Sequence, residues 1–195
     1  MRAIAARNPR KPFAREHHQG GYTESMARVD QLMSHPVVTC RTNDNLNTVA
    51  GLMWDHDCGV VPVVDDTGRL AGVVTDRDVC MAAYTQGRGL YEICVDSAMT
   101  RDPYACRPDD PSARAEEIMQ TRQVRRLPVV DAEGRPVGLL SLNDLAREAT
   151  RTGASQRGLL NGFARTLAAI CRPRSAKNDV GHVPAGWEDY VQRTS

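Results

Sequence analysis

The sequence predicts an α+β fold made of two copies of one unit, each a strand, a helix, two strands and a closing helix. Two observations predict it. The stretch 59–78 returns as 125–144 at a constant shift of 66 residues. Each copy joins a short Val-rich run, a turn and a second apolar run broken by one glycine, and then opens a helix-like segment. Such an internal repeat predicts two structural units that share one compact body.

The positions at which the residue type repeats after 66 residues are those where the backbone conformation or the side-chain chemistry allows few residue types. Asp65 and Asp131 can bond back to a turn, and Gly68 and Gly134 tolerate positive φ. The other repeated pairs are Pro62 with Pro128, Gly72 with Gly138, Thr75 with Ser141 and Asp78 with Asp144.

The first copy is predicted to span 25–86. It begins with apolar residues at helical spacing, which end ahead of Pro36 because proline disfavours helix for the residue before it. A short strand is predicted over 37–40. Asn43 or Asp44 would cap the next helix, which is expected to stop at Gly59 and to turn inward Leu46, Val49, Ala50 and Met53. Two strands follow, and the closing helix is predicted over 76–85.

The second copy, predicted over 87–150, repeats this order. After a hinge at 87–89, an entry helix is expected over 91–99 and a strand over 103–106. Asp110 would cap a helix that has Pro111 at its first position and ends near Thr121. Two more strands follow, and the closing helix is predicted over 142–150.

The flanking segments differ in character from the repeats. Residues 1–24 lack sustained periodicity and are expected to be a flexible leader, and 173–195 a disordered tail. The segment 151–172 is predicted to form an amphipathic helix, because apolar residues recur at helical spacing at Leu159, Leu160, Phe163, Leu167 and Ile170. This helix is expected to pack on the protein's own core or on a dimer mate. A basic helix lying on a membrane surface is the alternative.

Charge and composition argue against several functional classes. The net charge of +1 hides +4 on residues 1–18 and +4 on 151–195, which leaves −7 for the repeats and disfavours a nucleic-acid surface there. No apolar run approaches the roughly 18 residues of a membrane span, and no secretory signal is evident, so a cytoplasmic location is expected.

The cysteines and histidines do not predict a metal site. The six cysteines lack zinc-ligand spacing, and the repeat mates Cys40 and Cys106 are expected to be buried thiols rather than a redox pair. The pair His17-His18 lacks further ligands in sequence. The run Asp55-His56-Asp57-Cys58 is expected to be a solvated helix end.

Each copy carries a hydroxyl residue three positions before an aspartate, where the last strand meets the closing helix. Unpaired amides at a helix start favour an anionic or polyhydroxyl ligand. In Thr75 with Asp78, and in Ser141 with Asp144, the hydroxyl could reach a phosphate and the carboxylate could accept bonds from ribose hydroxyls. The same spacing is that of an ordinary helix cap, so the motif alone leaves both interpretations open.

Together with the flanking Gly and Pro, the two copies resemble a tandem pair of cystathionine-beta-synthase-type (CBS) domains, the Bateman module. The signature is an apolar residue, Pro, Val, Val, Asp, a turn Gly, then Gly, two apolar residues, Thr or Ser, two residues and Asp. The opening 98–103 fits the family's Met, Thr or Ser, two residues and Pro, and the opening 32–36 resembles it with one residue, His35, before Pro36. The resemblance covers about 25–150. It implies packing around a pseudo-twofold axis, with two clefts that often bind adenosine nucleotides.

The resemblance also implies site residues. In the related gamma subunit of the AMP-activated kinase, one cleft combines the opening of one repeat with the motif of the other. By position, Asp144 would hold ribose, and Ser141, Arg125 and Arg126 would face phosphate, although both arginines could instead be surface charges. The base and the cleft opening would be lined by Ser34, Val38, Thr39, Gly59, Val60 and Val61.

The mate cleft implied by the resemblance would take Thr75, Asp78, Thr100 and Ala105. At the two positions that hold Arg125 and Arg126 in the first cleft, the first copy has Gly59 and Val60. The second cleft is therefore expected to lack the cations that would bind phosphate.

The resulting hypothesis is a regulatory, homodimeric module that binds AMP, ADP or ATP and acts on a separate protein partner. The resemblance extends to S-adenosylmethionine and other adenosine derivatives. The alternative is a ligand-free dimeric interaction scaffold in which helix 156–172 mediates assembly. The chain has no G-x-S-x-G elbow, no P-loop and no local signature of a nucleophile and base, so no catalytic residue, required cofactor or enzyme activity is predicted.

Overall fold

The computed structural model of the chain describes residues 27–151 and 157–172, and these form an α+β fold, as the repeat predicts. The first half contains α1 (Val29–Leu32), β1 (Cys40–Arg41), α2 (Leu46–Asp55), β2 (Val60–Val64), β3 (Leu70–Thr75) and α3 (Asp76–Gln86). The second half contains η1 (Leu90–Glu92), η2 (Val95–Ser97), β4 (Thr100–Arg101), α4 (Ser112–Arg122), β5 (Arg126–Val130), β6 (Pro136–Ser141), α5 (Leu142–Arg151) and α6 (Arg157–Ile170). The predicted leader and tail lie outside the described residues.

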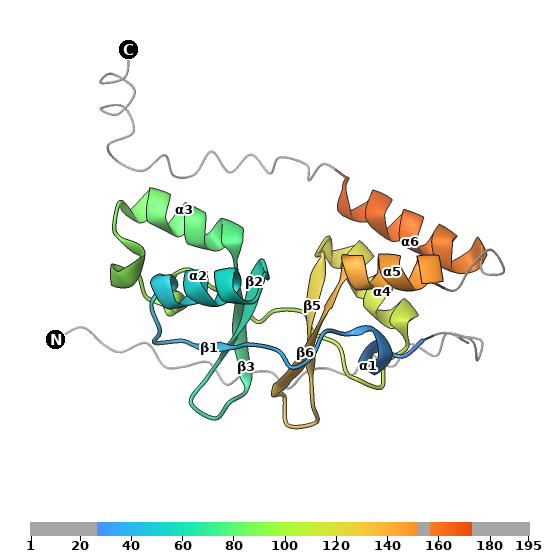
Figure 1. Cartoon of the computed structure of the whole chain (residues 1–195), viewed down its shortest axis with the longest axis horizontal. Coiled ribbons are helices and arrows are strands. Elements are labelled where there is room, and N and C mark those ends of the chain that lie inside the picture. Colours follow the sequence, from blue (N-terminus) through green and yellow to red (C-terminus); the bar gives the residue numbers. More distant parts are fainter. Residues whose placement is uncertain (1–26, 152–156, 173–195) are drawn as a thin grey trace, which may run out of the picture.

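Two antiparallel hairpins, β2–β3 and β5–β6, stand at the centre of the molecule (Figure 1). Their registers match under the 66-residue shift: Val61 pairs with Val74, and Leu127 pairs with Leu140. The turn chemistry is also confirmed. Asp65 accepts bonds from the amides of Thr67 and Arg69, Asp131 accepts one from Arg135, and Gly68 and Gly134 have φ of 77° and 82°.

The opening of each copy is exchanged onto the other copy. Ser34 N–H donates to Leu139 O at 2.9 Å and Leu139 N–H donates back to Ser34 O at 3.0 Å, so the first opening joins β6. In the mate position Thr100 of β4 lies opposite Val73 of β3. The apolar side chains follow: Val29 lies in the core of the second copy, and Ile93, Val95 and Met99 in that of the first.

This exchange also determines how the long helices start. Leu46 N–H donates to Ile93 O and Ser112 N–H donates to Ala27 O, both at 2.9 Å, so each first helical amide is satisfied by the other copy's opening. The predicted caps are wrong here. Asn45 caps α2 by accepting from Thr48 N–H at 3.0 Å, and Pro111 is the N-cap of α4, not its first residue.

Asp44 and Asp110, two of the predicted caps, instead brace the turns before these helices. Their carboxylates accept bonds from the amides of Arg41 and Arg107, each at 2.7 Å. An aspartate that bonds a nearby amide outside the helix is a local alternative to capping, and the sequence pattern does not separate the two.

Four predicted elements are shorter than expected. The described part of the first helix is one turn, the entry helix 91–99 is two 3₁₀ turns, and the strands 37–40 and 103–106 shrink to Cys40–Arg41 and to a single bridge between Cys106 and Val129. In the two openings the reason is the exchange, because their amides bond carbonyls of the other copy: Val29 N–H donates to Asp110 O at 3.0 Å and Val95 N–H donates to Asp44 O at 2.8 Å.

Helix α6 packs on α4 and α5, on the side of the second copy away from the first (Figure 1). Phe163 and Ile170 contact the second core, which confirms the expectation that this helix packs on its own chain. Leu167, predicted on the inward face, is 40% exposed, whereas its neighbour Thr166 is fully buried. The side chains of Leu159 and Leu160 lie outside the described part of the structure.

Cys40 and Cys106 are buried at matching positions of the two cores. Burial raises the pKa of both thiols to about 12, with smaller contributions from Asp44 and Asp110. These two residues therefore act as small apolar side chains, as the sequence indicates. Within the described ranges, no helix has the length and apolarity that a membrane crossing requires.

Candidate functional site

A pocket of about 320 Å³ lies between the two copies and is lined by both. This volume is within the range of small-molecule sites. Seven of the residues predicted for the first cleft line it: Ser34, Val38, Gly59, Val60, Arg126, Ser141 and Asp144. The exchanged opening places Ser34 beside β6, and β6 leads directly to Ser141.

Three residues predicted for this cleft are absent from the lining. Val61 is fully buried in the first core, because successive strand residues point to opposite faces and its neighbour Val60 takes the pocket side. Thr39 is exposed on the segment that leads to β1. Arg125 is exposed ahead of β5, and its carbonyl accepts a bond from Leu142 N–H at 2.9 Å.

The Ser141–Asp144 pair forms a helix cap at the pocket wall. Asp144 Oδ2 accepts bonds from Ser141 N–H at 2.7 Å and from Ser141 Oγ at 2.6 Å, while Ser141 Oγ accepts from Asp144 N–H at 3.3 Å. Thr75 and Asp78 make the same capping box in the first copy. The capping interpretation is thus correct for both copies, and the ligand interpretation depends on what each carboxylate can still accept.

Arg147 completes the environment of the Asp144 carboxylate. Its guanidinium bonds Asp144 Oδ1 from one turn along α5, and it also lines the pocket. The Asp144 side chain is only 4% exposed, whereas that of Arg147 is 74% exposed. A buried carboxylate at the pocket wall is therefore paired with a long cationic side chain that reaches into solvent.

Arg126 brings a second positive charge across the interface between the copies. A Cβ added at Gly59 would lie 3.3 Å from Arg126 Nη2 and 3.0 Å from Asp76 Oδ2. The absence of a side chain at Gly59 therefore lets an arginine of the second copy and an aspartate of the first approach the same backbone atom.

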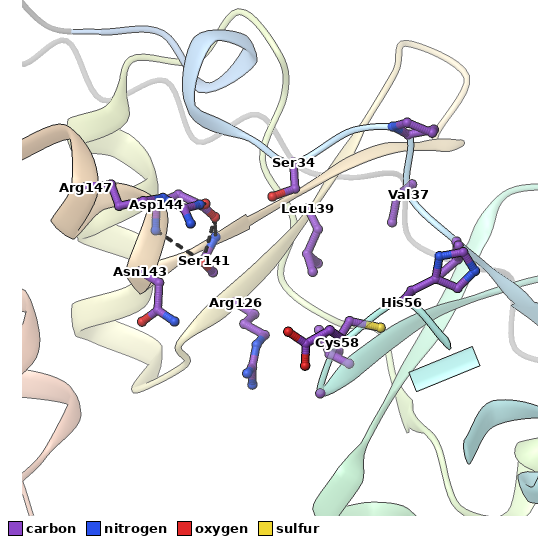
Figure 2. A pocket seen from close by; sticks show the side chains of 15 residues that line it. Ser34, Val37, His56, Cys58, Arg126, Leu139, Ser141, Asn143, Asp144 and Arg147 are labelled. Atoms are coloured by element: carbon purple, nitrogen blue, oxygen red, sulfur yellow. Dashed lines mark hydrogen bonds and ion pairs between the residues drawn. The ribbon is translucent and has the colours of Figure 1, made fainter. Parts of the chain in front are cut away.

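The structure adds eight lining residues that the sequence interpretation missed: Pro36, Val37, His56, Asp57, Cys58, Leu139, Asn143 and Arg147. Figure 2 shows Ser141, Asp144 and Arg147 together on one wall, His56 and Cys58 on the other, and Arg126 between them. The spacing of Asp144 and Arg147 is a recognisable ion-pair signal on a helix. The end of α2 gave no such signal, because its place beside the second copy is set by the tertiary fold.

The residues predicted for the second cleft have surroundings that differ from those of their repeat mates in the pocket. Thr75 and Asp78 cap α3, Thr100 lies in β4 opposite Val73, and Ala105 is half-buried beside Cys106. The 66-residue shift matches Tyr104 and Arg122 to the pocket residues Val38 and His56. Arg122 lies 4.6 Å over the centre of the Tyr104 ring, so a cation–π pair stands at this position in the second copy.

Among the described residues, no three His, Cys, Asp or Glu side chains gather as potential metal ligands. His17 and His18 lie outside the described residues.

A scan of protein families matches the CBS domain model at residues 29–84 and again at 93–151. The chain belongs to the CBS domain family. The CBS domain-containing protein YhcV of Bacillus subtilis is 35% identical over 121 residues, which are 62% of this chain and 84% of YhcV. An inosine-5'-monophosphate dehydrogenase of Methanocaldococcus jannaschii is 27% identical over 152 residues, or 77% of this chain, but that match spans only 28% of the enzyme.

Solved CBS structures have the same fold. CBSX2 in complex with AMP is 26% identical with a TM-score of 0.56, covering 64% of this chain and 97% of CBSX2. The CBS domain pair of MJ0100 in complex with 5'-methylthioadenosine and S-adenosyl-L-methionine is also 26% identical, with a TM-score of 0.57, and covers 63% of this chain and 98% of that pair. This chain is thus a CBS pair, and helix α6, which follows the matched ranges, packs on the second repeat.

Proposed function

We propose that this CBS pair is a regulatory module that binds an adenosine nucleotide, AMP, ADP or ATP, in the pocket between its repeats. One observation carries the proposal. The pocket is lined by Ser34 from the opening of one repeat and by the helix-capping Asp144 of the other, with the cation Arg126 beside them. The ribose, the base and the phosphate of a nucleotide can therefore each contact a part of the pocket with matching chemistry.

The relatives support this assignment. CBSX2 was solved with AMP, and the MJ0100 pair was solved with two other adenosine derivatives. Val37, Val38 and Leu139 offer apolar contact for a base, and Arg126 can pair with phosphate. The regulated protein, the homodimer and the absence of catalysis by this chain stay predictions within this proposal.

The first test is calorimetric titration of the full chain with AMP, ADP, ATP and S-adenosylmethionine. One site with micromolar affinity for at least one nucleotide is expected. Arg126→Met should weaken phosphate-bearing ligands by about tenfold, the typical effect of a lost hydrogen bond to a charged group. Arg125→Met is the matched control, because the Arg125 side chain is exposed and outside the lining; it should change affinity by less than about twofold.

Absence of binding by all four ligands would contradict the proposal and favour the ligand-free scaffold. Equal losses in the Arg126 and Arg125 variants would show that the phosphate contact is misplaced, even if a nucleotide binds.

A further inference from the structure

The two cations of the pocket are the feature that distinguishes it from its pseudo-symmetric mate. Arg126 and Arg147 both line the pocket. Their mates under the 66-residue shift are Val60 and Met81, so the first repeat offers apolar side chains at both positions. Capping alone does not require either arginine, since Thr75 and Asp78 form the same cap with Met81 in that place.

The carboxylate of Asp144 is almost fully used in the structure. A carboxylate has about four acceptor sites. Ser141 takes two of them at Oδ2, and Arg147, which also lines the pocket, occupies Oδ1. A ribose that offers two neighbouring hydroxyls to this carboxylate must therefore displace the guanidinium of Arg147.

The Arg147 side chain is 74% exposed, so water can solvate its guanidinium once it leaves Asp144. The buried Asp144 carboxylate exchanges this charged partner for the ribose hydroxyls. The released guanidinium is on the first turns of α5, beside the pocket, where it can form two parallel bonds to a phosphate.

We infer that Arg147 is a specificity-determining residue: it covers the sugar-binding carboxylate in the empty pocket and exchanges onto the ligand's phosphate when a phosphorylated nucleoside binds. This inference rests on the proposed function. The pocket then selects anionic nucleotides, because only a ligand with phosphate replaces the contact that Arg147 loses. An uncharged nucleoside leaves the guanidinium without its carboxylate, and a cationic ligand such as S-adenosylmethionine is repelled by Arg126 and Arg147.

The test compares adenosine, AMP, ATP and S-adenosylmethionine on the full chain by calorimetric titration, in the wild type and in Arg147→Met, which copies the residue of the first repeat. Affinity for AMP and ATP should fall by about tenfold, the effect of losing a charged hydrogen bond. Affinity for adenosine should stay the same or rise by about twofold, because Asp144 is then free. Arg147→Lys keeps the charge without the bidentate fork and should retain part of the preference for phosphate.

Arg135→Met is the control for the loss of one positive charge, since Arg135 is exposed on the β5–β6 turn of the same repeat and outside the pocket. It should leave all four affinities within about twofold. A thermal melt of each variant checks that the fold is intact.

The outcomes separate the two claims. If Arg147→Met weakens adenosine and AMP by the same factor, or changes neither, the selectivity role is wrong while nucleotide binding stands. If the wild type binds none of the four ligands, both the role of Arg147 and the proposed function fail.

Discussion

Gly72 and Gly138 lie where the exchanged openings contact the central hairpins. A Cβ at Gly138 would lie 2.4 Å from the sulfur of Met33, and one at Gly72 would lie 2.8 Å from the sulfur of Met99 and 2.7 Å from the carbonyl oxygen of Thr100. A methionine can bend away, but a backbone carbonyl held in a strand pair cannot do so easily. The repeated glycine of the family signature thus has a packing cause in this structure.

Gly72→Ala should therefore destabilise the protein by about 1–3 kcal/mol, the usual cost of overpacking. Gly51→Ala is the control: Gly51 lies in the exposed middle of α2 with nothing within 4 Å of an added Cβ, and alanine there should stabilise by about 0.5–1 kcal/mol. Chemical denaturation of both variants measures the difference. Equal stabilities for the two would show that the strand contact at Gly72 is looser than described.

At the scale of elements, α6 is fixed to α4 by a small polar cluster. The hydroxyl of the fully buried Thr166 accepts from Gln120 at 2.8 Å and lies within donating distance of Gly162 O, at 2.9 Å, and of Glu116 Oε2, at 3.3 Å. Because Gly162 has no side chain, Glu116 can approach α6 closely. Burial raises the pKa of Glu116, while the Thr166 bond and the charge of Arg165 oppose that rise. Ionisation of this carboxylate is therefore less favourable in the folded protein than in the unfolded chain.

Because the folded-state pKa of Glu116 is raised, the stability that its protonation contributes is present below the ordinary pKa of glutamate and is lost as the pH rises through the raised value. Glu116→Gln should be more stable than the wild type near pH 7.5, and the difference should close below about pH 4. Urea denaturation at both pH values measures it.

Glu117→Gln is the control for this pH dependence, since Glu117 is 43% exposed and pairs with Arg114 on the same helix. It should show no stabilisation at pH 7.5. A wild type that is more stable than Glu116→Gln at pH 7.5 would mean that Thr166 and Arg165 outweigh the cost of burial.

At the scale of the whole molecule, the sequence predicts the units but not how they exchange parts. The shift of 66 residues was enough for the hairpins, the Asp-Gly turns and the closing helices, because these depend on local spacing and turn chemistry. The first helix and the entry helix are shorter than predicted, and each places an apolar residue, Val29 or Ile93, in the core of the other copy. Propensity gives no information on such long-range partners.

The same limit applies to the pocket. Its Ser141–Asp144 wall follows from a repeated motif that is visible in sequence. Its opposite wall at His56 and Cys58 is the end of a helix, which becomes a site only when the second repeat is placed against it. Arg125 and Arg126 are adjacent in sequence, and only the strand geometry shows which of them enters the pocket.

The central claim is that one copy of the repeated motif, Ser141–Asp144, binds a nucleotide in the pocket between the repeats. The most direct measurement is AMP titration of Asp144→Asn beside Asp78→Asn. Both variants weaken equivalent helix caps and should lose similar stability, about 0.5–2 kcal/mol. The account predicts that Asp144→Asn weakens AMP by at least about tenfold while Asp78→Asn leaves this site within about twofold. Unchanged affinity in Asp144→Asn, or equal losses in both, would contradict it.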